Sequence, residues 1–521
     1  MRGKKVLSLL LAATMSLSVL AGCGAKKEDA GKKDAKKDGP VEITVGFWNA
    51  QEALSGGEND KMLKTLEEKT NVRLIPQDMT DTDYHEKVQL WATNGQLPDI
   101  FCGDFIGLGQ SSFYDWVDQG VIRALPDDLS KYPNLEEYMT MQRAKDAQQN
   151  GKNYIIPRRS YKDITYSVLD RNIIYRWDLA QKVGVTKEPE TWDEFRDMLR
   201  KIIAADPEGK NIGGMCQQGV KTLAGCMYPY GGILEKKWIV NEEGKVLPSV
   251  FDGDYKAVMQ LARDMYEEGT ILKDVTQING NTAYDAFMQG KVAALAFNGG
   301  PANLCKFEKD YQAINGRPLL GDIKVAPIFP GVDGEKWYFV DTEAWSETYF
   351  SSKVDDEKMD AILRLYDFLV SEEGKTLMFC GIEGEDYDVV DGKPVMKEGV
   401  VLTEKYPFAL MNNLAMHSPT DWDQKYAAHI PEEYYALNDA RHEDAVNNGK
   451  LPELCDAALM LSTPLKDKFF YDPHEDFYRI MMGKEPVDKM VDETMKEYKN
   501  KGLDAMLEEV NKVAKEKGIL K

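Results

Sequence analysis

A strand–helix–strand pattern at the start of the folded region constrains the fold of this chain more than any other feature. Residues 41–48 (VEITVGFW) alternate and then become apolar, as a strand entering a core does, and residues 72–75 (VRLI) form a second strand candidate. Between them, residues 60–70 place a methionine and two leucines on one helical face. A strand, a helix and a strand within about forty residues form a βαβ unit with parallel strands. The sequence therefore predicts an α/β fold.

The same alternation continues downstream. Thr191 and Glu194 form a capping box that predicts a helix start, and residues 284–289 read as a helix ended by Gly290. Residues 292–297 (VAALAF) follow as a buried strand. Long amphipathic helices are expected at 358–370 and 487–514.

The first 23 residues are typical of a bacterial lipoprotein leader. A basic start precedes the apolar run Val6 to Leu20, and Leu20-Ala-Gly-Cys23 then places small residues before a cysteine. The apolar run is shorter than the roughly 20 residues that cross a bilayer as a helix. We therefore expect residues 1–22 to be removed and Cys23 to carry the lipid that anchors the protein to the membrane. An ordinary secretory leader that leaves a free cysteine is the alternative.

Residues 23–39 are interpreted as the lipidated cysteine and a flexible tether. Six lysines and four acidic residues lie between Gly24 and Gly39, with no aromatic or β-branched side chain, so this segment cannot bury enough apolar area to fold. The folded part then starts at Pro40. The net charge of the whole chain is −22, which argues against nucleic acid as a partner.

The cysteines give no sign of a metal site or a disulfide scaffold. Beyond Cys23 they are widely scattered and no CxxC motif occurs. Cys216 and Cys226 could pair across a loop, but we expect them to be buried free thiols. The six are Cys102, Cys216, Cys226, Cys305, Cys380 and Cys455.

Recognisable catalytic motifs are missing. The sequence has no GxSxG elbow, no GxxxxGK[ST] phosphate loop and no HExxH zinc motif. His442 and His474 each precede a glutamate but lack a second histidine four residues later. We therefore expect a protein that is not an enzyme and needs no cofactor.

Several segments in family order resemble the extracellular solute-binding proteins (family 1) of sugar ABC importers, especially the large oligosaccharide-binding lipoproteins of Gram-positive bacteria. The resemblance spans nearly the whole mature chain. It rests on residues 97–101 (LPDIF), 120–125 (GVIRAL), 174–184 (IYRWDLAQKVG), 189–195 (PETWDEF), 286–294 (AFMQGKVAA), 381–387 (GIEGEDY) and 482–486 (MGKEP).

The resemblance implies a two-lobed, periplasmic-binding-protein-like fold of type II, with a ligand cleft between lobes joined by several crossing strands. Residues 40–156 and 298–350 would form the first lobe, and residues 157–297 and 351–521 the second. Larger members of this family often carry a calcium loop. The matching stretch here, residues 206–213 (DPEGKNIG), has few of the 6 to 8 oxygen donors that calcium takes, so we expect no metal.

Aromatic and polar side chains near the expected strand ends are candidates for holding a sugar, because sugars offer apolar C–H faces and a rim of hydroxyls. Trp48 ends the first strand, where open α/β sheets bind ligands, although it could equally be a core residue. Asp104 follows residues 97–101, where members of the family present a polar cleft residue, and a carboxylate accepts two hydroxyls.

A second group of candidates follows the first expected crossing. Arg158, Arg159 and Tyr161 come after Ile156-Pro157, and an arginine fork binds sugar hydroxyls or a uronate carboxylate. An ion pair between the lobes is the alternative for the arginines. Asn298 begins a glycine-rich stretch expected at the hinge and cleft edge.

Three further tryptophans precede or follow the third expected crossing, and we expect one of them to stack on a sugar. They are Trp337, Trp345 and Trp422. Trp192, inside the capping box, is expected to pack at its helix start instead.

Together these features predict a receptor, anchored by lipid on the outer face of the cell membrane, that delivers an oligosaccharide to the permease subunits of an ABC importer. We expect a monomer that binds the membrane through its lipid alone. The alternatives are a surface glycan-degrading enzyme and a receptor for a peptide or another small solute.

Overall fold

The first strand and helix form where the sequence predicts them. The computed structural model describes residues 39–80, 83–106, 112–235, 237–417, 419–427 and 430–520. The predicted leader, Cys23 and most of the tether lie outside the described residues.

The first sheet is built around the predicted βαβ unit. β1 (Val41–Trp48) pairs in parallel with β2 (Val72–Met79) and with β3 (Ile100–Gly103). β12 (Ala344–Phe350) runs antiparallel to β3 and to β4 (Ile155–Arg159), which gives the order β2-β1-β3-β12-β4. The parallel βαβ prediction is confirmed.

The crossover helix α2 (Lys61–Thr70) buries Met62, Leu63 and Leu66, the predicted apolar face. Its N-cap, Asp60, is 2% exposed and accepts hydrogen bonds from two backbone N–H groups. One carboxylate oxygen accepts from Leu63 at 3.0 Å, and the other accepts from Phe408 at 2.8 Å. Asp60 therefore joins the start of α2 to a segment almost 350 residues later in the chain.

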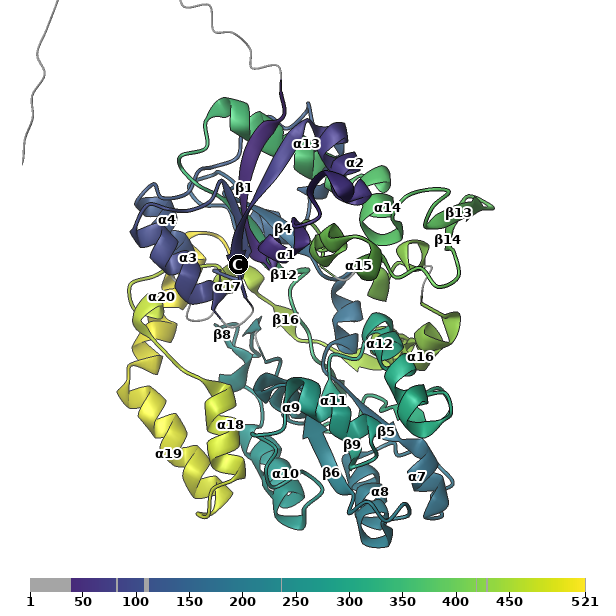
Figure 1. The fold of residues 1–521 in the computed structure, drawn as a ribbon. Coiled ribbons are helices and arrows are strands. Elements are labelled where there is room, and N and C mark those ends of the chain that lie inside the picture. Colours follow the sequence, from purple (N-terminus) through teal and green to yellow (C-terminus); the bar gives the residue numbers. More distant parts are fainter. Residues whose placement is uncertain are drawn as a thin grey trace, which may run out of the picture. The chain divides into compact units, whose positions relative to one another are not determined.

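The second sheet has the order β10-β5-β9-β6. β9 (Val292–Phe297) is buried along its whole length, as predicted, and pairs in parallel with β6 (Gly213–Gln217). β5 (Asn172–Arg176) runs antiparallel to β9 and to β10 (Ile323–Val325). The prediction of mixed α/β architecture is confirmed by the two sheets and the helices on them (Figure 1).

The predicted capping box at α8 (Trp192–Ala205) forms only in part. Thr191 accepts the hydrogen bond of the Glu194 N–H at 3.2 Å, but the Glu194 carboxylate accepts from the Glu190 N–H instead of from Thr191. Trp192 is buried at this helix start, as predicted.

The remaining elements surround the two sheets and join them. The other strands are β7 (Trp238–Val240), β8 (Val246–Pro248), β11 (Lys336–Trp337), β13 (Tyr387–Val390), β14 (Lys393–Met396), β15 (Gly449–Lys450) and β16 (Glu453–Leu454). The longer helices are α3 (Tyr84–Thr93), α9 (Val220–Met227), α10 (Tyr255–Glu268), α11 (Gly280–Met288), α12 (Pro301–Asn315), α13 (Asp356–Val370), α14 (Glu372–Cys380), α16 (Glu432–Asn448), α18 (Pro473–Met481), α19 (Val487–Asn500) and α20 (Leu503–Glu516). The shorter α-helices are α1 (Ala50–Ala53), α4 (Ser112–Asp118), α5 (Pro133–Tyr138), α6 (Gln142–Asp146), α7 (Trp177–Lys182), α15 (Leu402–Lys405) and α17 (Asp456–Leu459).

Two segments pack on a different sheet from the one that their expected lobe implies. α12 and β10, expected in the first lobe, pack with the second sheet, because Leu304 and Ile323 share an apolar core with Leu295 of β9. α13, expected in the second lobe, packs beside β1 and α2 (Figure 1). Amphipathic patterns show which face of a helix is buried but not which sheet covers it.

The predicted helix over residues 487–514 is wrong as a single element. It divides into α19 and α20 at Gly502, whose φ is +104°, a conformation that L side chains rarely adopt. The two helices on either side of this break pack in different hydrophobic cores. Val487 and Val491 of α19 pack in the core of the second sheet, and Met506 and Val510 of α20 pack in the core of the first.

Within the described residues, no helix is both long enough and apolar enough to cross a membrane. The six cysteines after Cys23 are free thiols, Cys216 and Cys226 included. Burial raises the pKa of both of these thiols to about 12.

We expect Asp60→Ala to lower the free energy of unfolding by about 2–5 kcal/mol, because it leaves two buried N–H groups without an acceptor. Denaturation in urea measures this loss. Glu58→Ala removes the same charge two residues earlier from a side chain that is 88% exposed, and should cost much less. Equal losses in the two variants would contradict this account of Asp60.

Candidate functional site

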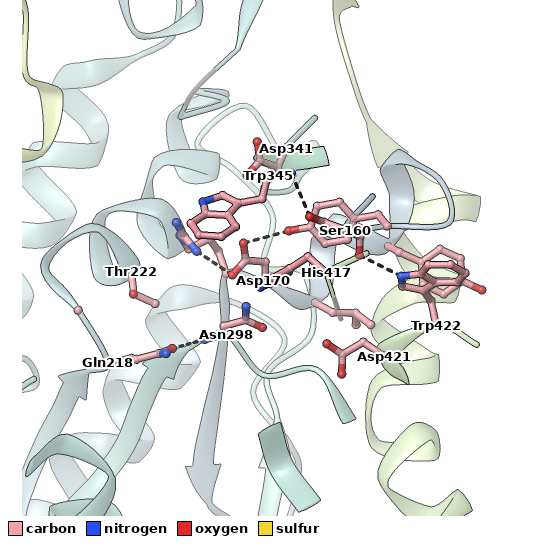
Figure 2. A pocket seen from close by; sticks show the side chains of 15 residues that line it. Ser160, Asp170, Gln218, Thr222, Asn298, Asp341, Trp345, His417, Asp421 and Trp422 are labelled. Carbon is pink, nitrogen blue, oxygen red and sulfur yellow. Dashed lines mark hydrogen bonds and ion pairs between the residues drawn. The ribbon is translucent and has the colours of Figure 1, made fainter. Parts of the chain in front are cut away.

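The ends of strands from both sheets meet at one cavity of about 340 Å³, called the central cavity below. Ser160 follows β4, Gln218 follows β6 and Asn298 follows β9, and all three line it. Trp345, near the start of β12, joins them because β12 is antiparallel to β4 and Ala344 pairs with Arg159. In Figure 2, Gln218 and Asn298 lie on the opposite side of the pocket from Trp345. The volume is within the range of small-ligand sites.

Ser160 positions the two tryptophans that line the central cavity. Its Oγ accepts a hydrogen bond from the backbone N–H of Trp345 at 3.0 Å. Its carbonyl oxygen accepts from the indole N–H of Trp422 at 2.9 Å (Figure 2). Both rings are half-buried, so each keeps surface open to a ligand.

Trp48 does not line the central cavity but packs against Trp345, which does. It is 7% exposed, and its ring centroid is 5.5 Å from that of Trp345. The structure thus places Trp48 as packing support for Trp345, closer to the core alternative than to direct ligand contact.

The two arginines are also absent from the cavity lining. Arg158 is fully buried; it donates to the Asn413 carbonyl at 3.1 Å and to Ser346 Oγ at 2.6 Å. Its guanidinium lies 5.0 Å from the Trp48 ring centroid, so Arg158 supports Trp48, which in turn packs against Trp345. The Arg159 guanidinium lies over the Tyr138 ring at 5.6 Å. Among the described residues, neither arginine has a carboxylate within 4.0 Å, so the alternative interpretation, an ion pair between the lobes, is not supported either.

Asp104 and Trp337 lie outside the lining of the central cavity as well. Asp104 accepts a hydrogen bond from the Tyr84 hydroxyl and lies 3.1 Å from His85 Nε2. Trp337 donates its indole N–H to Asp333 at 3.0 Å. Of the predicted site residues, the structure brings together Tyr161, Asn298, Trp345 and Trp422.

A buried group of hydrogen-bonded side chains lies at the central cavity, where the chain approaches β5. Asp170 accepts from the Tyr161 hydroxyl at 3.1 Å and from Arg171 at 2.7 Å. Burial, together with the charge of Asp170, raises the pKa of the Tyr161 hydroxyl well above its ordinary value. Tyr161 therefore remains a neutral donor, and Asp170 is held in one orientation at the cavity.

His417 is a cavity residue that the sequence interpretation missed. Burial, with a contribution from the positive charge of Arg158, lowers its pKa to about 3. The imidazole is therefore neutral at neutral pH, with one nitrogen that donates and one that accepts, which suits a hydroxyl group. Its ring centroid lies 5.2 Å from that of Trp345.

Asp421 is the second missed residue. One of its carboxylate oxygens accepts from the Ala302 N–H at 2.9 Å, at the start of α12. Burial raises its pKa to about 6, although this hydrogen bond and Lys306 oppose the rise. The only sequence signal for both missed residues was the polar, histidine-bearing stretch around Trp422.

In residues 206–213, the stretch that matches the family's calcium loop, the carboxylates already have partners within the protein. The Glu208 carboxylate lies 2.7 Å from Lys182 and 2.9 Å from Lys210. Although burial opposes it, these two lysines lower the pKa of Glu208 to about 2. The Asp206 carboxylate accepts from three backbone N–H groups of the same loop. Among the described residues, no group of three or more His, Cys, Asp or Glu side chains is arranged to hold a metal ion.

Comparison with known proteins identifies the family. The family model described as bacterial extracellular solute-binding protein matches residues 61–383, more than half of the chain. The chain belongs to the bacterial extracellular solute-binding proteins. This family consists of binding proteins rather than enzymes, and its members act outside the cell.

Relatives and solved structures agree with this family. Lipoprotein LipO of Bacillus subtilis is 23% identical over 75% of this chain and 74% of its own length. The polygalacturonan/rhamnogalacturonan-binding protein YtcQ of the same organism is 23% identical over 75% and 76%. The substrate-binding protein FusA of S. pneumoniae, solved with kestose, superposes with a TM-score of 0.70 at 17% identity over 92% of this chain and all of FusA. The predicted two-lobed, periplasmic-binding-protein-like fold of type II is therefore confirmed.

The raised pKa of Asp421 predicts a pH-dependent effect on stability. The unfolded carboxyl ionises near its ordinary pKa of 3.8 and the folded one near 6, so the stabilisation is complete below pH 4 and is lost as the pH rises through 6. Asp421→Asn keeps the acceptor for Ala302 without ionising. Its melting temperature relative to the wild type should therefore rise by a few degrees between pH 4 and pH 7.

Thermal unfolding at a series of pH values measures this difference. Asp118→Asn serves as the control, because it makes the same substitution at an exposed carboxylate. A difference for Asp421→Asn that stays constant with pH would contradict the proposed burial of its charge.

Proposed function

We propose that this chain is a lipid-anchored receptor that captures an oligosaccharide outside the cell and delivers it to the permease of an ABC importer. The central cavity carries this proposal. Trp345 and Trp422 offer flat faces, and carboxylates, a neutral histidine and amides surround them. Flat aromatic faces match the C–H faces of sugars, and the polar groups match their hydroxyls.

The comparisons support a sugar rather than another solute. YtcQ is named for polygalacturonan and rhamnogalacturonan, and FusA was solved with kestose. A peptide or another small solute remains the alternative within the same family. Peptide recognition commonly pairs backbone groups with an exposed strand edge, whereas the residues that line the central cavity include two tryptophans and several with polar side chains.

The location follows from the leader. We propose that residues 1–22 are a signal peptide, that Cys23 is lipidated and that residues 23–39 tether the domain starting at Pro40. The name of lipoprotein LipO supports this assignment. A receptor held in this way stays beside its transporter in a cell that has no outer membrane.

The proposed receptor acts as a monomer and performs no reaction. A surface glycan-degrading enzyme is the rival, and it would release shortened products during incubation. Recovery of the intact oligosaccharide from a tight complex would exclude that rival.

We expect thermal-shift screening to give positive shifts with oligosaccharides and none with peptides. A ligand at 100 times its dissociation constant adds about 2.7 kcal/mol of stability. Trp345→Ala and Trp422→Ala should each weaken binding by about tenfold or more, because each removes an aromatic face worth about 1.4 kcal/mol or more. Titration calorimetry measures the dissociation constants.

Trp337→Ala is the matched control, because its ring lies outside the central cavity. Its affinity should match that of the wild type. A loss as large as that of the two cavity variants, or shifts with peptides alone, would refute the proposal.

We expect Cys23→Ser to release the protein from the membrane into the medium, because a hydroxyl does not replace the thiol that carries the lipid. Cell fractionation and mass spectrometry of residue 23 measure this change. Cys305→Ser, at a half-buried free thiol of the folded domain, should stay with the membrane. Membrane retention of Cys23→Ser would show that the anchor lies elsewhere.

A further inference from the structure

A second concave surface of about 560 Å³ adjoins the central cavity and is called the outer groove below. It lies between the hairpin strand β14 and the segment around Trp422, and Lys162 completes it. Trp422 lines both the outer groove and the central cavity. In Figure 2, Trp422 lies at the margin of the side chains that line the central cavity. A chain-like ligand that contacts this ring can therefore occupy both spaces.

The two spaces carry opposite charge. Asp170, Asp341 and Asp421 line the central cavity, and its one arginine, Arg171, is engaged by Asp170. The outer groove presents three lysines and one aspartate. This concentration of positive charge stands out in a chain whose net charge is −22.

Two of the three lysines are available for a ligand. Lys425 is paired with Glu372. Lys162 and Lys393 are exposed, and among the described residues neither makes an ion pair or a side-chain hydrogen bond. Beside them, the exposed Val395 offers an apolar surface to the C–H groups of a sugar ring.

We propose that the outer groove is a second subsite, which binds an anionic substituent on an oligosaccharide whose neutral unit occupies the central cavity. This inference rests on the proposed function. Carboxylates in the central cavity accept hydroxyl groups but repel an anion. Lys162 and Lys393 attract a carboxylate or a sulfate ester, and Trp422 separates the two units. The ligand class is therefore an oligosaccharide of mixed neutral and acidic units.

Binding of matched oligosaccharides to the full mature chain tests this assignment. The probes are xylotetraose and the same chain with one glucuronate, neutral galactan oligosaccharides, alternating rhamnose–galacturonate oligosaccharides, and oligogalacturonate. A sulfated xylotetraose distinguishes the two anionic groups. Titration calorimetry at low and at high salt gives each dissociation constant.

We expect at least one mixed oligosaccharide to bind about tenfold more tightly than its neutral counterpart at low salt, and this advantage to shrink at high salt. Oligogalacturonate, acidic in every unit, should bind more weakly than the mixed probe. The double variant Lys162→Gln/Lys393→Gln should lose most of the advantage and keep the affinity for neutral chains. Lys499→Gln, an exposed lysine of α19, is the control for charge and should keep the advantage.

The other outcomes separate the two proposals. Equal affinity for neutral and mixed probes, tightest binding of oligogalacturonate, or an advantage that survives in the double variant would overturn the second subsite and leave the oligosaccharide receptor standing. Binding of none of the sugars would refute the receptor function, and the subsite with it. A preference for either the carboxylate or the sulfate supports the subsite and identifies its anion.

Discussion

The hydrogen bonds of Ser160 are the interaction on which the central cavity depends. This residue is 3% exposed and is the first to follow β4. Its N–H donates to the Glu343 carbonyl, its Oγ accepts from Trp345, and its carbonyl oxygen accepts from the Trp422 indole. Ser160, where the chain leaves the first sheet, thus holds the main chain of Trp345 and the ring of Trp422.

The charge of the side chains changes from the core behind Trp345, through the central cavity, to the surface. The buried Arg158 binds a carbonyl and a hydroxyl rather than a carboxylate, and its positive charge adds to the burial that keeps His417 neutral. The cavity itself presents carboxylates and neutral donors, and the lysines lie outside it. Since an unpaired charge loses its hydration when buried, a neutral unit fits the enclosed space better than an ionised one.

Local patterns predicted the elements well, whereas the site needed the tertiary structure. The alternation in residues 41–48 and the apolar face of residues 60–70 each depend on neighbours close in sequence, so β1 and α2 were predictable. Trp345 and Trp422 were recognised as candidates by residue type and expected location. His417 and Asp421 were not, because their roles arise from Arg158 and Ala302, more than 100 residues away. Arg158 was predicted to contact the ligand, because nothing in the neighbouring sequence indicates that it is buried behind Trp48.

Under the proposed function, a bound oligosaccharide would connect the two sheets. Asn298 follows a strand of the second sheet, Trp345 belongs to the first, and Asp421 bonds to the start of α12 from the segment that also supplies Trp422. An oligosaccharide that contacts Trp345 and Asn298 together is bound only in arrangements that bring both strand ends to the same cavity. Under the proposed function, any difference in its affinity between arrangements of the two sheets is the free energy that would shift the population among them.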